Sequence, residues 1–315
     1  MRAKRLCAML RLMKAVLRLT GTLVLALVLL ASALHISNSG QNPAPPKAPG
    51  TVRVATHNVH YIVLRRDEGA WSVGDWNRRK GPLDDMFKAI EADIFAFQEM
   101  ESFAGGSGGE VNLTLDHLLG ENSGYAAAAV GDWREFPSTQ PILFRKDRFR
   151  VLDQGWFFFS ETPEVIYSRT FDGSYPAFAS WARFAPRGEG RPFYVFNVHF
   201  EYKSRSNRTR SAELVRERIA ALNAADEPVF LLGDVNDRVG SRTVGILERA
   251  GLTFSPVAGA TYHFNRGINL FGAIDHLAIT SNIALAVAPV VLRQRFRGEW
   301  PSDHYPVFAD FRLPD

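Results

Sequence analysis

The most informative stretch of this chain is Ala92-Asp93-Ile94-Phe95-Ala96-Phe97-Gln98-Glu99. The segment Asp93–Phe97 predicts a short buried strand, and that strand leads directly to an amide and a carboxylate. Since a buried strand delivers Glu99, we expect this side chain to have a chemical role rather than an ordinary place on the surface.

Other strand-like runs end in polar residues in the same way. Val52–Thr56 alternates like a strand and leads to His57-Asn58, and Val229–Leu232 leads to Gly233-Asp234-Val235-Asn236. Near the end of the chain, an exposed turn carries Asp303-His304. Carboxylates and amides that converge from strand ends are what a divalent-metal phosphoester site requires.

Strand-like and helix-like segments alternate along the chain. Apolar spacing predicts helices over 84–91, 210–224 and 241–250, and further strands over 141–144, 155–159, 178–184, 193–200, 272–280, 284–292 and 307–311. We expect 141–144 and 155–159 to be neighbouring strands joined by a basic turn, and 104–109 to be a glycine-rich surface connection. The alternation predicts a single layered α/β domain.

The N-terminal segment predicts export or anchoring. Residues 1–34 begin with basic side chains, continue with the apolar stretch Leu19–Leu34 and contain Ala31-Ser32-Ala33 near its end. This order is typical of a secretory signal cleaved after Ala33, with an uncleaved membrane anchor as the alternative. Either case places the body outside the cytoplasm, secreted, periplasmic or anchored. Residues 35–50 predict a proline-rich linker, and 51–315 predict the catalytic domain.

The charge of the chain belongs largely to this leader. Six of the 37 basic residues lie in 1–34, where no acid occurs, so the body carries 31 basic and 33 acidic residues. The net charge of the body therefore gives no indication of general electrostatic binding to nucleic acid. The single cysteine, Cys7, also lies in the leader, which excludes thiolate metal sites and a cysteine nucleophile from the body.

The polar residues favour magnesium over zinc. Magnesium takes oxygen donors and usually needs only one or two protein carboxylates, which Glu99 and Asp303 can supply with Asn58 nearby. His57 and His60 would point to opposite faces of a strand, which does not suit a zinc site.

Taken together, the motifs resemble the endonuclease/exonuclease/phosphatase superfamily of magnesium-dependent phosphoesterases. The resemblance spans residues 51–313 and rests on these motifs, in the family's order: Thr56-His57-Asn58-Val59, Ala92–Glu99, Phe196-Asn197-Val198-His199, Gly233–Asn236, Ala273-Ile274-Asp275-His276 and Ser302-Asp303-His304. It implies a four-layer α/β/β/α sandwich of two mixed β-sheets flanked by helices. It also implies a Mg²⁺ ion, which Mn²⁺ can replace, held by Glu99 with Asn58 adjacent and Asp303 assisting.

The resemblance further implies roles in proton transfer and charge stabilisation. His304, oriented by Asp275, looks like the general base, while Asp234 would position or deprotonate the attacking water. Which of these two groups takes the proton stays open. His199 and Asn236 would hold the non-bridging phosphate oxygens as charge develops on them.

The substrate is the least determined part. Basic residues follow His199 closely, and we expect Arg205, Arg208 and Arg210 to contact substrate phosphates. The leading expectation is a monomeric nuclease acting on nucleic acid. The alternative is a phosphodiesterase or phosphatase acting on a lipid headgroup or small molecule, which membrane association through the N-terminus would favour. A catalytically silent binding module on the same fold is the third alternative.

Overall fold

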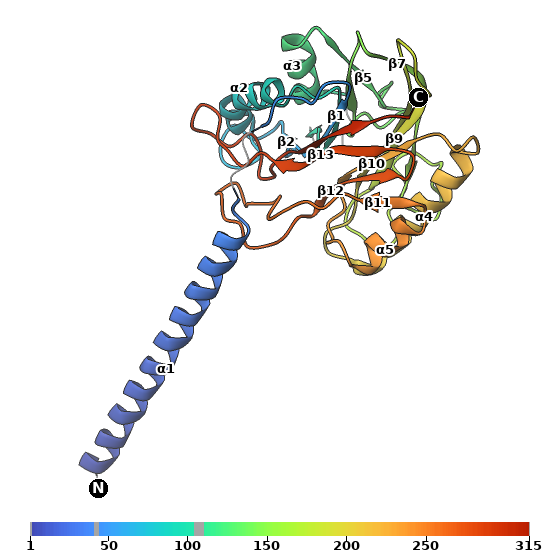
Figure 1. Ribbon diagram of the computed structural model, residues 1–315. Coiled ribbons are helices and arrows are strands. Elements are labelled where there is room, and N and C mark those ends of the chain that lie inside the picture. The colour runs from blue at the N-terminus through green and yellow to red at the C-terminus, as the bar shows by residue number, and fades with distance from the viewer. Residues whose placement is uncertain (1, 41–43, 104–109, 315) are drawn as a thin grey trace.

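The computed structural model describes residues 2–40, 44–103 and 110–314, so the glycine-rich stretch 104–109 lies outside it. Two six-stranded mixed sheets form the body (Figure 1). The first has the order β13-β14-β1-β3-β6-β5, with bounds Ala284–Val291, Val307–Arg312, Val52–Asn58, Ile94–Gln98, Ile142–Arg145 and Tyr125–Ala128. The second has the order β11-β12-β10-β9-β8-β7, with bounds Leu252–Phe254, Asp275–Thr280, Val229–Asp234, Phe193–His199, Phe178–Pro186 and Phe149–Phe158. A small parallel pair, β2 (Ile62–Val63) and β4 (Ser102–Phe103), lies apart from both.

Helices cover the outer faces of the two sheets. Side chains of α2 (Val73–Ile90) and α3 (Leu113–Glu121) pack in one apolar cluster with the outer face of the first sheet. Those of α4 (Arg205–Leu222) and α5 (Arg242–Glu248) pack in another cluster with the second sheet. The order helix, sheet, sheet, helix confirms the predicted four-layer sandwich (Figure 1).

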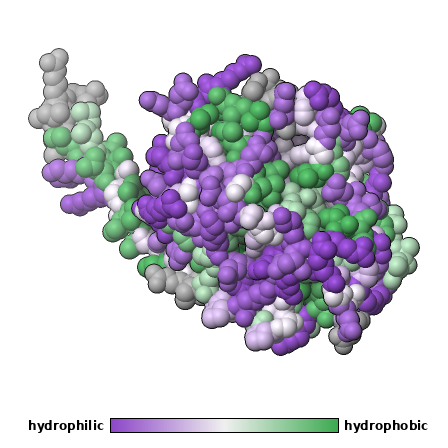
Figure 2. All heavy atoms as spheres, turned by 90° about the horizontal axis from the view of Figure 1, so that it is seen from above, coloured by the Kyte–Doolittle hydropathy of each residue, from purple (hydrophilic) through white to green (hydrophobic). Residues whose placement is uncertain are grey.

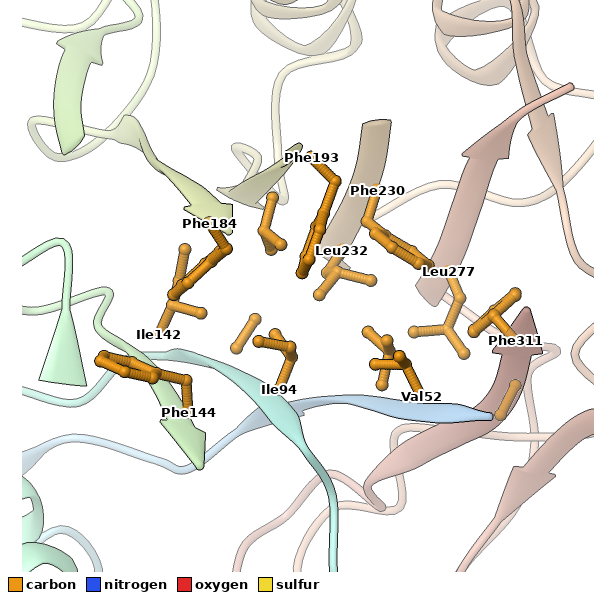
Figure 3. Close-up of a cluster of buried hydrophobic side chains, with 14 of the residues drawn as sticks. Val52, Ile94, Ile142, Phe144, Phe184, Phe193, Phe230, Leu232, Leu277 and Phe311 are labelled. Atoms are coloured by element: carbon orange, nitrogen blue, oxygen red, sulfur yellow. The ribbon is translucent and has the colours of Figure 1, made fainter. Parts of the chain in front are cut away.

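The main core lies between the sheets. Figure 3 shows side chains from both sheets pointing toward one another, among them Ile94 from β3 and Phe193 from β9. Along β3, Ile94 and Ala96 belong to this inter-sheet core, whereas Phe95 and Phe97 pack with the helices. Because successive side chains of a strand point to opposite faces, a strand buried on both faces reads as a continuous apolar run. This explains the sequence of the opening stretch.

One predicted strand pair is wrong. The segments 141–144 and 155–159 fall in β6 and β7, which belong to different sheets. The short basic turn at 146–148 carries the chain from one sheet to the other. Strands that follow each other in sequence usually pair, but here β6 pairs with β3 and with β5, and no strand was expected at the position of β5.

Helix ends follow their capping residues. The hydroxyl oxygen of Ser241 accepts a hydrogen bond from the backbone of Val244 and caps α5 as expected. Ser204 caps α4, which begins at Arg205, five residues before the predicted start. Helix α2 begins at Val73, well before the predicted start at residue 84. Pro82 lies inside it, although an internal proline is ordinarily a sign that a helix has ended.

Helix α1 (Arg2–Ser37) is continuous and projects away from the body (Figure 1). Its segment Met9–Ser37 has a mean hydropathy of 2.2 and is long and apolar enough to cross a membrane, a property that signal sequences share. Figure 2 shows its apolar side chains beside a body whose visible surface is largely hydrophilic.

Candidate active site

The ends of four strands and the start of a fifth bring the predicted polar residues together. In the first sheet, parallel pairing of β1 with β3 sets Asn58 opposite Gln98, with Glu99 directly after it. In the second sheet, Asp234 at the end of β10 lies opposite His199 on β9 and Asp275 on β12. The site is therefore assembled across the gap between the two sheets.

Asp234 is the central residue of the cluster. The amide of Asn58 donates hydrogen bonds to Glu99 Oε1 at 3.0 Å and to Asp234 Oδ2 at 3.2 Å. His199 Nε2 lies 3.7 Å from Glu99 Oε1 and 3.8 Å from Asp234 Oδ2. His304 Nε2 is 3.8 Å from the same oxygen of Asp234. One carboxylate oxygen thus faces groups from both sheets.

His304 is held from behind by a buried carboxylate. Its Nδ1 lies 2.9 Å from Asp275 Oδ2, and Asp275 is fully buried. The backbone of His304 is fixed as well, because its amide donates to Ser302 Oγ and its carbonyl faces the ring of His57 at 3.0 Å. The ring therefore presents Nε2 to Asp234 in a fixed orientation.

Burial and neighbouring charges move the pKa values of these groups in opposite directions. Burial lowers the pKa of His304, but the carboxylates of Asp275 and Asp234 outweigh it and raise the pKa to about 10. Burial, followed by the charge of Asp275, raises the pKa of Asp234 to about 6. Burial lowers the pKa of His199. Near neutral pH the cluster thus contains a His304 imidazolium beside an ionised Asp234.

The acidic side of the site has a buried cation nearby, Arg79, but this guanidinium pairs with Asp75 rather than with Glu99 or Asp303. Burial and the nearby Asp303 carboxylate raise the pKa of Glu99. Across the described ranges of the chain, no lysine or arginine forms an ion pair with Glu99, Asp234 or Asp303. Asp303 is half-buried and accepts a hydrogen bond from Ser302 Oγ at 3.3 Å. The site therefore holds excess negative charge.

Asn236 reaches the site through its backbone. Its amide N–H donates to Asp234 Oδ1 at 2.9 Å, while its side chain donates to the carbonyl of Phe200. The residue has a positive φ of 50°, which lets the chain turn sharply after β10.

The predicted substrate-binding arginines lie in helix α4, and two of them form ion pairs with acidic side chains. Arg208 faces Asp237 at 3.5 Å and donates to backbone carbonyls, including that of Glu201 at 2.9 Å. Arg210 pairs with Glu161 and lies over the ring of Phe171. Arg205 is exposed at the first turn of the helix.

Two supporting contacts escaped sequence reasoning. Buried Arg79 donates to the carbonyls of Val59 at 2.7 Å and Pro301 at 3.2 Å, which ties the ends of two site segments together. Gln98 donates to Asn197 Oδ1 at 2.6 Å, and Asn197 in turn donates to the carbonyl of Phe97 at 2.8 Å, linking β3 to β9. A buried amide inside each apolar strand is a signal that could have indicated the second contact.

Comparison with known proteins agrees with this geometry. The family model described as "Endonuclease/Exonuclease/phosphatase family" matches residues 55–304. None of the curated proteins searched matches significantly. Similar solved structures include an endonuclease/exonuclease/phosphatase family protein from Bacteroides thetaiotaomicron, with 25% identity, a TM-score of 0.69 and coverage of 84% of this chain and 98% of that one.

Two further neighbours differ in what their names report. A mannosyl-6-phosphatase from B. thetaiotaomicron VPI-5482 is 25% identical, with a TM-score of 0.69 over 82% of this chain and 99% of that one. TDP2 from D. rerio, in complex with a single-strand DNA product, is 16% identical, with a TM-score of 0.60 over 83% and 98% of the two chains, and shows the fold alone. The match of the family model over most of the sequence shows that this chain belongs to the endonuclease/exonuclease/phosphatase family.

Proposed function

We propose that this protein is a magnesium-dependent phosphoester hydrolase in which a water molecule attacks phosphorus in line with the leaving group. The observation that carries the proposal is the position of Asp234, whose carboxylate lies between the Asn58–Glu99 pair and the His304–Asp275 pair. Family membership supports phosphoester hydrolysis as the reaction class.

The donor set fits a hard divalent cation. Glu99, Asn58 and Asp303 offer carboxylate and amide oxygens, the ligands that magnesium prefers. The uncompensated negative charge around them supports the same assignment, with Mn²⁺ as a substitute. When bound, such an ion would neutralise the phosphate charge. Ligand atoms of Asp234, Asp275 and His304 also lie within 4.8 Å of one another, but Asp275 and His304 already hydrogen-bond each other, so we assign the cation to the Glu99 group.

The water's proton goes to Asp234 in this proposal. His304 carries a proton already because its pairing with Asp275 raises its pKa to about 10, so it is poorly suited to accept another near pH 7. Asp234 is ionised there, accepts a hydrogen bond from the Asn236 amide and has a second oxygen facing the site. A base whose pKa lies near the working pH is effective in proton transfer.

The remaining polar groups would bind the phosphate. Nε2 of His304 and Nε2 of His199 each lie 3.8 Å from the same oxygen of Asp234, and a protonated His304 would stabilise charge on the non-bridging oxygens. The amide of Asn236, whose side chain now donates to a backbone carbonyl, is proposed to assist at the same oxygens.

For the substrate, the contacts favour a small or lipid-borne phosphoester. Arg208 and Arg210 are engaged with Asp237 and Glu161, so neither offers a free guanidinium to a second phosphate. Of the solved neighbours named above, the phosphatase of a mannosyl-6-phosphate group is also more similar than TDP2. Nucleic acid is the second candidate, which the exposed Arg205 and the DNA complex of TDP2 favour.

A substrate panel tests both statements. The purified chain is incubated with a bis-aryl phosphodiester, mannose 6-phosphate, sphingomyelin vesicles and plasmid DNA, each in magnesium and in EDTA, beside an Asp234→Asn control. Magnesium-dependent turnover of a small or lipid phosphoester that the variant lacks is the expected result. Turnover of DNA alone would reverse the substrate assignment, and full activity in EDTA would refute the metal assignment.

A further inference from the structure

We propose that the loop 259–271 and the last turn of α1 form one membrane-docking surface, with α1 retained as an anchor. This inference concerns a lipid surface and does not depend on the hydrolytic activity. Three features of the molecule meet at one place: an apolar helix, a loop with exposed apolar side chains and a wall of the candidate active site.

The end of α1 is bonded into the loop. The ring of His35 accepts a hydrogen bond from the backbone N–H of Asn269 at 3.1 Å, and the amide of Asn269 donates to Ser39 Oγ at 2.7 Å. The carbonyl of Asn38 accepts a hydrogen bond from Ala260 N–H at 3.2 Å. These polar contacts come from residues that follow Ala33, and they fix the direction in which α1 leaves the body.

Apolar contacts extend the junction along the helix. A groove of about 460 Å³ lies between α1 and the loop, and its lining is Val28, Ala31, Ser32, His35, Ile36, Ile268 and Leu270. The loop thus follows the helix for more than two turns before Ser37. Val28 and Ala31 lie about 15 and 10 Å before Asn38 along the helix, so the apolar side of the loop continues alongside the segment that a bilayer would cover.

The length of α1 places the bilayer boundary at this junction. Arg18 is the last charged residue before the apolar stretch. A helix crossing the hydrocarbon core needs about 20 residues, so a span that starts after Arg18 ends close to Asn38. The basic residues before it, Arg11 and Lys14 among them, would stay on the cytoplasmic side, which leaves the body outside.

The loop itself has the composition of an interfacial segment. Phe264, Ile268 and Phe271 are exposed, and Phe271 is 46% accessible. Arg266, between the first two, is exposed and forms no ion pair within the described part of the chain, so it is free to meet lipid phosphates. Exposed aromatic and aliphatic side chains interspersed with a cation are typical of segments that lie in the headgroup region.

The same loop forms a wall of the candidate active site. Tyr262 makes a backbone bridge with His304, and their rings lie 5.0 Å apart. The ring of Phe264 lies 4.5 Å from that of Tyr262 and 5.9 Å from that of Phe271, so aromatic side chains run from the site to the surface. Docking the loop on lipid would therefore bring the mouth of the site to the membrane surface.

Single-cysteine labelling of the full chain tests the proposal. In a Cys7→Ser background, a fluorophore is attached at Phe271→Cys or at Leu285→Cys, and the chain is reconstituted in vesicles of phosphatidylethanolamine and phosphatidylglycerol. Leu285 is a matched control because it is 39% exposed and begins the edge strand β13 at the end remote from the site. Quenching by a doxyl group attached to lipid is compared with quenching by aqueous iodide.

The expected result is loss of iodide quenching and gain of lipid quenching at position 271, with the reverse at position 285. Equal exposure of both labels to iodide would overturn the proposal, as would recovery from cells of a chain that begins at Leu34. An Asp234→Asn version should dock in the same way. If this inactive variant docks, the docking surface stands whether or not the proposed reaction is correct.

Discussion

Replacing Asp275 with asparagine removes the charge that keeps His304 protonated. The carboxylate lies 2.9 Å from His304 Nδ1, is fully buried and has one oxygen without a hydrogen-bond partner in the described chain. Without this charge, burial dominates, and the pKa of His304 should fall from about 10 to its ordinary value of 6.5 or below. Breaking a buried ion pair costs about 3–5 kcal/mol of folding stability, and asparagine should stay near the lower end because its amide can retain a hydrogen bond.

The assay is a pH–rate profile with a bis-aryl phosphodiester at saturating magnesium. The parent enzyme should show a bell-shaped profile, rising as Asp234 ionises near pH 6 and falling as His304 loses its proton near pH 10. Because the two groups interact, the apparent pKa values of the two limbs describe the Asp234–His304 pair rather than either residue alone. In Asp275→Asn the alkaline limb should move down by about 3.5 pH units or more, and the maximal rate should fall by about 10²–10⁴-fold.

A matched variant separates the charge effect from general destabilisation. Arg53 and Asp310 form a similarly buried ion pair, with Nε and Oδ1 2.6 Å apart, in the first sheet and away from the strand ends that carry the site. Asp310→Asn should lower the melting temperature comparably and leave both limbs in place. An unchanged alkaline limb in a folded Asp275→Asn protein would refute the reasoning about His304.

Three further outcomes follow from the same electrostatics. Asp234→Asn should abolish turnover yet raise the free energy of unfolding in EDTA at pH 7 by about 3 kcal/mol, because the folded state raises the pKa of this carboxyl; denaturant titration measures it, and a destabilised variant would contradict it. Glu99→Gln should require a higher magnesium concentration for half-maximal rate by about tenfold or more, and an unchanged magnesium titration would exclude Glu99 as a ligand. The stability that the raised pKa of His304 contributes is complete below pH 6.5 and should be lost as pH rises through about 10. Urea titrations below pH 6.5 and above pH 10 measure this loss, which a His304→Gln variant should not show.

The sequence allowed the convergence of the site to be predicted because most of its polar residues, Asn58, Glu99, His199 and Asp234 among them, stand at the end of a buried strand or directly after it. Parallel pairing of β1 with β3 and of β9 with β10 sets the ends of these strands side by side, so Asn58 meets Glu99 and His199 meets Asp234. Within one strand end, residues that are neighbours in sequence also stay neighbours in the folded protein. The two-sheet architecture followed from the family resemblance rather than from periodicity.

Contacts between distant segments could not be predicted in the same way. Arg208 and Arg210 stand close to His199 in sequence, but Asp237 and Glu161 reach them in the folded protein. The separation of β6 from β7 likewise depends on the path of one short turn, which apolar patterning does not specify. Long-range partners of charged side chains are set by the tertiary fold.

The amide link between β3 and β9 has a consequence for how the molecule opens. Gln98 and Asn197 join the two sheets by directional hydrogen bonds beside the apolar core, next to the strand ends that hold Glu99 and Asp234. An apolar interface alone can slide, but these bonds must break before one sheet moves against the other. Hydrogen exchange of the β3 and β10 amides should therefore proceed only through global unfolding, and the catalytic centre would be among the last parts of the protein to lose its protection.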